Sequence, residues 1–110
     1  MIMNNGYIYL ICDPSNDTYK IGVTRDIKSN RIKKLQTGNS TKLHIIHIYN
    51  CKYLFRLETM LHSFYKNKNE LNEWFKLSND EVFNFIKTCE SLDKQLHSLL
   101  DNPFFNKNIK

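Results

Sequence analysis

The sequence has no apolar run approaching the roughly 18 or more residues that a membrane-spanning helix needs. Its first ten residues, MIMNNGYIYL, also lack the charged segment and the long apolar segment of a signal peptide. We therefore expect a protein that has no membrane partner, is not secreted, and works in the cytoplasm or inside a host cell.

Cysteine is scarce, and the three residues present are Cys12, Cys51 and Cys89. Their odd number, their wide spacing and the lack of any Cys-x-x-Cys pair argue against a disulfide framework and against a structural zinc site. The simplest interpretation is three reduced thiols that fill small apolar positions.

No repeat or linker divides the 110 residues. With 41% hydrophobic and 25% charged residues, the chain has the composition of an ordinary globular protein with one core. We expect a single domain over residues 1–100, with a helix at 79–100 and a flexible tail at 101–110. The net charge of +5 favours anionic partners, with nucleic acid before membrane surfaces, although many basic proteins bind neither.

The residue pattern predicts a mixture of strands and helices. Strand patterns occupy residues 6–12, 18–24 and 42–49, with a short extended piece at 73–77. Helical patterns begin at the capping residues Asp26 and Asn79 and at Cys51, and they cover 26–36, 51–67 and 79–100. The order predicts an α+β domain, a small three-stranded antiparallel sheet flanked by helices.

The first two strands form a hairpin, because only the turn-rich segment 13–17 separates them. Side chains alternate between the two faces of a strand. The apolar positions that belong in the core are Ile8, Leu10, Ile21 and Val23. Tyr9 and Lys20 then emerge together on the other face, next to Gly22, which leaves room for them.

Two short motifs in this hairpin resemble those of a known nuclease family. Residues 7–9 read Tyr-Ile-Tyr and residues 20–22 read Lys-Ile-Gly, with eleven residues from Tyr9 to Lys20. They are similar to the GIY and YIG elements of the GIY-YIG superfamily. Tyrosine replaces the GIY glycine and lysine replaces the YIG tyrosine, which most resembles the phage- and virus-associated branch. Arg31, Glu58 and the Glu-Trp-Phe segment at 73–75 also fit, so the resemblance covers roughly residues 6–86.

The resemblance implies a GIY-YIG-like fold and a metal-dependent endonuclease that hydrolyses phosphodiester bonds in DNA. Glu58 would hold one Mg²⁺ (or Mn²⁺), because hard oxygen ligands suit these ions. Lys20 and Arg31 would neutralise charge on the phosphate. Tyr9 would act as the general base, since neighbouring cations favour the phenolate. His62, four residues after Glu58, belongs to the same catalytic set.

Further residues are secondary candidates. His62 is an alternative base, and Tyr7 shares the face of Tyr9 and could orient the water. Tyr19 and Gly22 adjoin the second motif. A basic group that would contact the nucleic-acid backbone consists of Arg25, Lys28, Lys33 and Lys34.

Each of these residues also has a structural interpretation. Tyr9 could be a half-buried strand aromatic, Lys20 and Arg31 could be solvated cations, and His62 could lie at the edge of the core. Glu58 borders an apolar stripe, where a carboxylate is costly unless it is paired, with Arg31 for example, or bound to metal. The alternative function is a non-catalytic nucleic-acid-binding or protein-interaction module on the same fold.

The last helix carries apolar residues at a helical spacing, namely Val82, Phe85, Cys89, Leu92, Leu96 and Leu99. This stripe predicts packing against the helix's own domain. The alternative is a homodimer through residues 82–99. No motif that reads base sequence is present, so DNA or RNA as substrate, and sequence or structure specificity, stay open.

Overall fold

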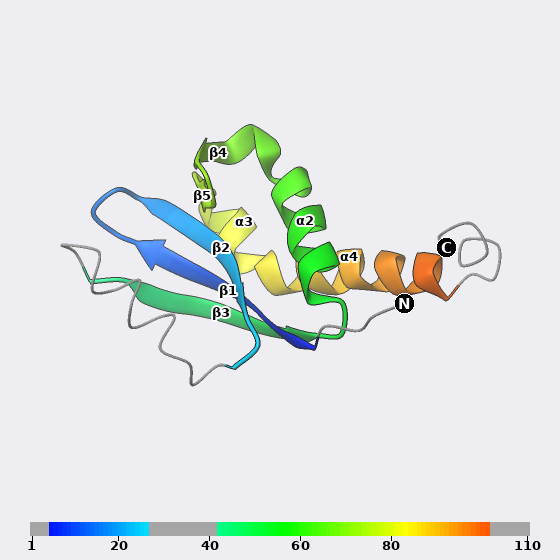
Figure 1. Cartoon of the computed structure of the whole chain (residues 1–110). Helices are drawn as coiled ribbons and strands as arrows, with labels where there is room; N and C mark the ends of the chain where they lie inside the picture. Colours follow the sequence, from blue (N-terminus) through cyan, green and yellow to red (C-terminus); the bar gives the residue numbers. More distant parts are fainter. Residues whose placement is uncertain (1–4, 27–41, 102–110) are drawn as a thin grey trace.

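The computed structural model describes residues 5–26 and 42–101 (Figure 1). Within them lies one antiparallel sheet whose strand order is β3-β1-β2-β5-β4. The strands are β1 (Gly6–Asp13), β2 (Thr18–Thr24), β3 (His44–Cys51), β4 (Asn69–Leu71) and β5 (Trp74–Phe75). The helices are α2 (Leu54–Phe64), α3 (Asn79–Phe83) and α4 (Phe85–Leu100), with a 3-10 turn η1 (Lys66–Lys68). The predicted α+β class is confirmed.

The prediction of a three-stranded sheet is wrong, because the β4–β5 hairpin adds two strands beside β2. β4 has only three residues, all of them exposed, so it shows no alternation that a sequence pattern could reveal. The turn between the two strands places Asn72 at φ 53°, a conformation that asparagine tolerates better than most residues. The segment at 73–77, predicted as a short extended piece, contains β5, which pairs with β2 at Tyr19 and Lys20.

The helices cover one face of the sheet (Figure 1). α2 packs against β1 and β2, α4 packs against β3, and the two helices pack against each other. The predicted stripe of α2 is confirmed, because Leu54, Leu57 and Leu61 are fully buried. They share the core with the predicted inward residues of the hairpin. This packing fixes which side of α2 lies next to β2.

The hairpin has the predicted faces. Tyr9 pairs with Gly22, and Ile11 pairs with Lys20. Directly paired residues of antiparallel strands point to the same side of a sheet. Tyr9 and Lys20 therefore share the face opposite the core, but neither side chain emerges into solvent as expected, since the two residues are only 1% and 9% exposed.

The predicted helix at 79–100 is two helices, broken at Asn84. Ser78, rather than Asn79, is the N-cap, and it forms a capping box with Glu81. The Asn84 side-chain amide donates to the carbonyl of Asp80 at 2.9 Å, and the residue leaves the helical conformation at φ −93° and ψ 9°. A side chain that competes for backbone hydrogen bonds in this way interrupts a helix.

The apolar stripe of α4 packs against its own domain. Phe85, Cys89, Leu92 and Leu96 are buried in the common core, and Leu99 alone among the stripe residues of α4 is half exposed, at 50%. The side chains that would have formed a dimer seam are therefore largely occupied within the protomer. No helix in the described part of the chain is long and apolar enough to cross a membrane.

The three cysteines are unpaired thiols, as predicted. Burial raises the pKa of Cys51 and of Cys89 to about 12. Residues 27–41 and 102–110 lie outside the described residues, and with them most of the predicted helix at 26–36 and of the predicted tail.

Candidate active site

Three side chains with metal-binding atoms converge where α2 meets β2 and the turn before β5. Glu58 and His62 come from α2, and Glu73 comes from the turn that precedes β5. One ligand atom from each lies within 4.8 Å of the others, and all three residues are partly exposed. Two carboxylates and an imidazole at this separation form a donor set that suits a divalent cation.

The flank of α2 presents two of these residues. Leu57 and Leu61 lie in the core, and the residues that follow them, Glu58 and His62, lie on one side of this buried stripe. They are four apart and so are neighbours on the helix surface, with 4.0 Å between Glu58 Oε2 and His62 Nε2. The predicted pairing of Glu58 with His62 on one helix face is therefore confirmed.

The imidazole of His62 is held in one orientation. Its Nε2 lies 3.0 Å from the carbonyl oxygen of Ile21, and its ring meets Phe75 edge-on with 5.1 Å between the ring centres. Because a carbonyl oxygen only accepts, Nε2 must carry the hydrogen of this bond. In the neutral imidazole the lone pair is then on Nδ1. The ring nitrogen that lies 4.0 Å from Glu58 is Nε2, so a metal bound through Nε2 would replace its hydrogen bond to Ile21.

Glu73 is positioned from both the backbone and the side chain. Its carbonyl accepts a hydrogen bond of 3.1 Å from the amide of Ile21, which fixes the β5 hairpin to β2. Its carboxylate forms an ion pair with the ammonium of Lys20, whose Nζ also lies 5.7 Å from the centre of the Trp74 ring. Lys20 is therefore part of the same cluster of side chains.

Sequence reasoning missed the role of Glu73. The residue belongs to the Glu-Trp-Phe segment that the resemblance singled out, but no role was given to it. The signal was the single carboxylate in that matching segment. Its nearness to Glu58 and His62 arises only because β5 pairs with β2.

Tyr9 is enclosed against its paired neighbour. A Cβ atom placed on Gly22 would lie 2.5 Å from Cζ of Tyr9, so the ring covers the glycine backbone closely. The predicted role of Gly22, to leave room, is confirmed by this contact. The phenol is buried, whereas His62 keeps 28% of its side chain exposed.

The other candidates have different placements. Tyr7 is partly buried on the face of Tyr9, and Tyr19 points to the opposite face, where it packs at the edge of the core. Burial, followed by the nearby Cys12 and Asp17, raises the pKa of Tyr19. Arg25 is exposed, and its guanidinium lies 5.5 Å from the centre of the Phe55 ring. The remaining predicted cations, Lys28, Arg31, Lys33 and Lys34, lie outside the described residues, as does the suggested pairing of Arg31 with Glu58.

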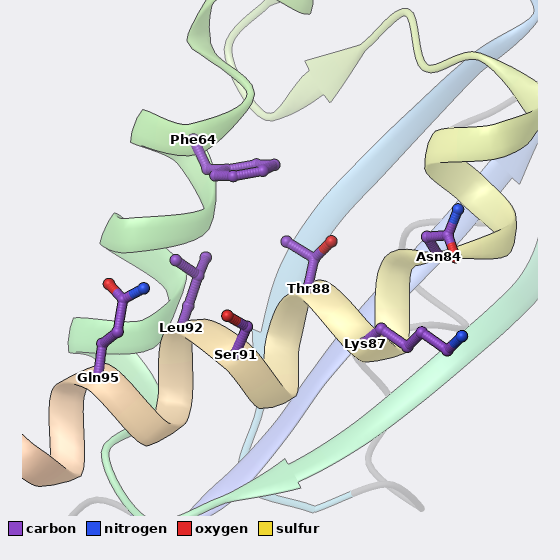
Figure 2. A pocket seen from close by; sticks show the side chains of 7 residues that line it. All are labelled: Phe64, Asn84, Lys87, Thr88, Ser91, Leu92 and Gln95. Atoms are coloured by element: carbon purple, nitrogen blue, oxygen red, sulfur yellow. The ribbon is translucent and has the colours of Figure 1, made fainter.

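A pocket between α2 and α4 differs from this cluster in the side chains that line it (Figure 2). Phe64 projects over it from α2, and Thr88, Ser91 and Gln95 line it from α4. Its described lining has one charged group, Lys87, and no carboxylate or imidazole. It therefore offers no acid–base pair and no metal ligands, and the cluster of Glu58, His62 and Glu73 is the better candidate.

The charges of that cluster suit a phosphodiester once a cation is present. Among the described residues, the cluster holds two carboxylates and the one ammonium of Lys20, and carboxylate oxygens are ligands that a divalent cation prefers. A bound cation would add positive charge that favours the anionic phosphate. The donor set therefore fits Mg²⁺ or Mn²⁺, although Glu73 must be shared with Lys20.

Comparison with known proteins gives one family. No curated protein and no solved structure matches the chain. The family model of the T5orf172 domain, a phage-associated domain found in some nuclease-like proteins, matches residues 6–90. That span includes the hairpin, α2 and the turn before β5, which carry every described residue of the cluster. Because the match covers most of its length, this chain belongs to the T5orf172 domain family.

Proposed function

We propose that this protein is a metal-dependent endonuclease that hydrolyses phosphodiester bonds in DNA. The observation that carries the proposal is the convergence of Glu58, His62 and Glu73, with Lys20 beside them. The family, found in some nuclease-like proteins, and the GIY-YIG resemblance of the hairpin support the same reaction. The basic net charge of +5 agrees with a nucleic-acid substrate.

The carboxylates of Glu58 and Glu73 would hold the metal, Mg²⁺ or Mn²⁺, and the imidazole of His62 would complete the donor set. A nitrogen ligand shifts the preference from Mg²⁺ towards Mn²⁺. When bound, such an ion neutralises charge on a phosphate and lowers the pKa of a coordinated water.

The ammonium of Lys20 would contact both Glu73 and the phosphate. In the described structure it neutralises Glu73. A phosphate oxygen is a second acceptor for the same three N–H donors, so Lys20 can bind the scissile phosphate while keeping Glu73 in place. The nearby indole of Trp74 limits the directions that the lysine side chain can take.

Two groups can take the proton from the attacking water, the oxygen of Tyr9 as a phenolate and the unprotonated ring nitrogen of His62. A base must lie within hydrogen-bond reach of the water. We assign the base to Tyr9 and the metal to His62, because one imidazole lone pair cannot serve both. This assignment requires that the buried hydroxyl of Tyr9 reaches the water when the substrate is bound.

The test compares the wild-type protein with Glu58→Gln on labelled duplex, branched and single-stranded DNA, with Mg²⁺, Mn²⁺ or EDTA. We expect metal-dependent cutting by the wild type and loss of cutting in the variant, because the amide has lost the charge that holds the ion. Glu90→Gln is the matched control, since Glu90 is exposed on α4 away from the cluster, and it should cut normally.

Binding without cutting, equal in both proteins and in every metal, would contradict the proposal. That result would support the non-catalytic nucleic-acid-binding module. Substituting Tyr9→Phe in the same assay tests the base, because the ring and its packing stay while the proton acceptor is lost. Full cutting by Tyr9→Phe would transfer the role to His62.

A further inference from the structure

A second feature adjoins the proposed site at the hairpin end of the sheet. It is a hollow of about 440 Å³, open to solvent, between the β1–β2 turn and the β4–β5 hairpin. Asn16 and Thr18 line it from one side, and Leu71, Trp74 and Lys76 line it from the other.

Strand register places the hollow on the face that carries Lys20. Lys20 pairs with Trp74 across β2 and β5, so the two side chains point to the same side. Thr18 lies two residues before Lys20 on β2, and it therefore points to that side as well. Trp74 directly follows Glu73, and Lys20 Nζ lies 5.7 Å from its ring centre. The hollow and the proposed metal ligands are thus joined through adjacent residues of one hairpin.

The walls of the hollow combine a flat apolar surface with polar groups at its margin. Trp74 supplies an aromatic plane, and the side chain of Leu71 is unusually open for its type, with the residue 66% exposed. Lys76 Nζ donates to the carbonyl of Asn16 at 3.2 Å, which ties the two sides of the hollow together. Planar rings with polar edges, such as nucleobases, are recognised by stacking on an aromatic side chain together with hydrogen bonds at the edge.

The charges of the hollow favour a base over a phosphate. Asp13 and Glu70 also contribute to its lining. The carboxylate of Asp13 accepts hydrogen bonds from Ser15 and Asn16 and so stays in place as part of the wall. With Lys76 as the one cation in the described lining, the two carboxylates disfavour a phosphate group, whereas the amino groups of a base edge can donate to the exposed carboxylate of Glu70.

We propose that Trp74 and this hollow receive one unpaired base close to the scissile phosphate. In a duplex both faces of a base are covered by stacking, so only a single-stranded, flapped or flipped-out nucleotide can enter. The substrate class is therefore nucleic acid that is single-stranded or splayed at the cleavage point. This inference rests on the proposed function, because it takes the ligand to be nucleic acid.

The chain allows a direct measurement, because Trp74 is its only tryptophan. The wild-type protein is titrated in EDTA with a single-stranded oligonucleotide, with the same strand made abasic, and with a blunt-ended duplex of two fully paired strands, while tryptophan fluorescence is followed. We expect quenching by the strand with bases and little change with the other two. Equal fluorescence changes with the abasic and the normal strand would overturn the inference.

Variants of Trp74 and Leu71 test the same proposal through binding affinities, which do not depend on tryptophan fluorescence. Trp74→Ala should weaken binding of single-stranded DNA, measured by anisotropy of a labelled strand, by about 5- to 150-fold, which corresponds to the usual range for one base stacked on an aromatic ring. Trp74→Phe, which keeps a ring, should recover part of the affinity. Leu71→Asp adds charge at an exposed position that does not support the core, and it should also weaken binding.

Phe83→Ala is the matched control, because Phe83 is an exposed aromatic residue on α3 outside the hollow. It should bind as the wild type does. Wild-type affinity in Trp74→Ala and Leu71→Asp would overturn the base pocket.

The outcome is separable from that of the proposed nuclease. In one outcome the wild type cuts DNA in a metal-dependent way that Glu58→Gln abolishes, while tryptophan fluorescence shows no base-dependent quenching. That result would support the nuclease proposal and reject the base pocket. Base-dependent quenching with no cutting in any metal would retain the pocket and reject the nuclease. Absence of binding to every nucleic acid would reject both.

Discussion

The ring of Tyr9 lies directly over Gly22, its paired residue on the neighbouring strand. Glycine in a strand normally weakens it, and an aromatic ring from the partner strand can cover the exposed backbone. Here the arrangement also sets where the Tyr9 hydroxyl points. A side chain at position 22 would displace the proposed base.

Gly22→Ala should therefore be destabilising as well as inactivating. The added Cβ would lie 2.5 Å from Cζ of Tyr9, so the ring or the strand must shift. We expect a loss of about 1–3 kcal/mol in the free energy of unfolding, the usual cost of overpacking. Urea denaturation measures it. Unchanged stability would mean that Tyr9 has another rotamer available, and a smaller loss in the Tyr9→Phe background would locate part of the clash at the hydroxyl.

Glu73→Gln should weaken metal binding and also release Lys20. The substitution removes one proposed ligand charge and breaks the ion pair with Lys20. We expect Mn²⁺ to bind at least about tenfold more weakly, which corresponds to about 1.4 kcal/mol. Isothermal titration calorimetry with Mn²⁺ alone measures it, with Glu90→Gln as control. If Glu73→Gln binds Mn²⁺ as tightly as the wild type does, the Glu73 carboxylate is only the ion-pair partner of Lys20 and not a metal ligand.

Two substitutions at His62 separate its structural and chemical roles. His62→Ala leaves the carbonyl of Ile21 without its donor, and we expect a loss of about 1–3 kcal/mol in stability. His62→Gln can restore a donor but has no imidazole nitrogen that could bind a metal, so we expect near-normal stability without metal-dependent cutting. Thermal unfolding and the cleavage assay measure the two effects. Normal cutting by the glutamine variant would leave His62 with a structural role alone.

Cys51 and Cys89 should make the fold sensitive to alkali. Burial raises the pKa of each thiol to about 12, from an ordinary value of 9.0. Between these values the folded state holds more protons than the unfolded state, so stability is fully present below about pH 9 and falls as pH rises towards 12. Melting temperatures measured over this range should therefore fall, and less steeply in Cys51→Ala/Cys89→Ala. Identical pH profiles in the two proteins would contradict this account.

The sequence by itself determined which side chains share a face of a strand or a helix, because this depends only on the spacing of residues along that element. Alternation in the hairpin put Tyr9 and Lys20 on one face, and the helical spacing of Leu57 and Leu61 put Glu58 and His62 on one flank of α2. These features are confirmed because a strand or a helix fixes side-chain direction within a few residues.

Tertiary structure alone decided what completes the site. Glu73 reaches His62 because the Ile21 amide pairs with the Glu73 carbonyl, a contact between two strands that lie far apart in the chain. The burial of Tyr9 and the pairing of β5 with β2 likewise arise from how the strands meet. No spacing rule encodes such contacts, because they depend on the balance of packing over the whole domain rather than on the repeat of any one element.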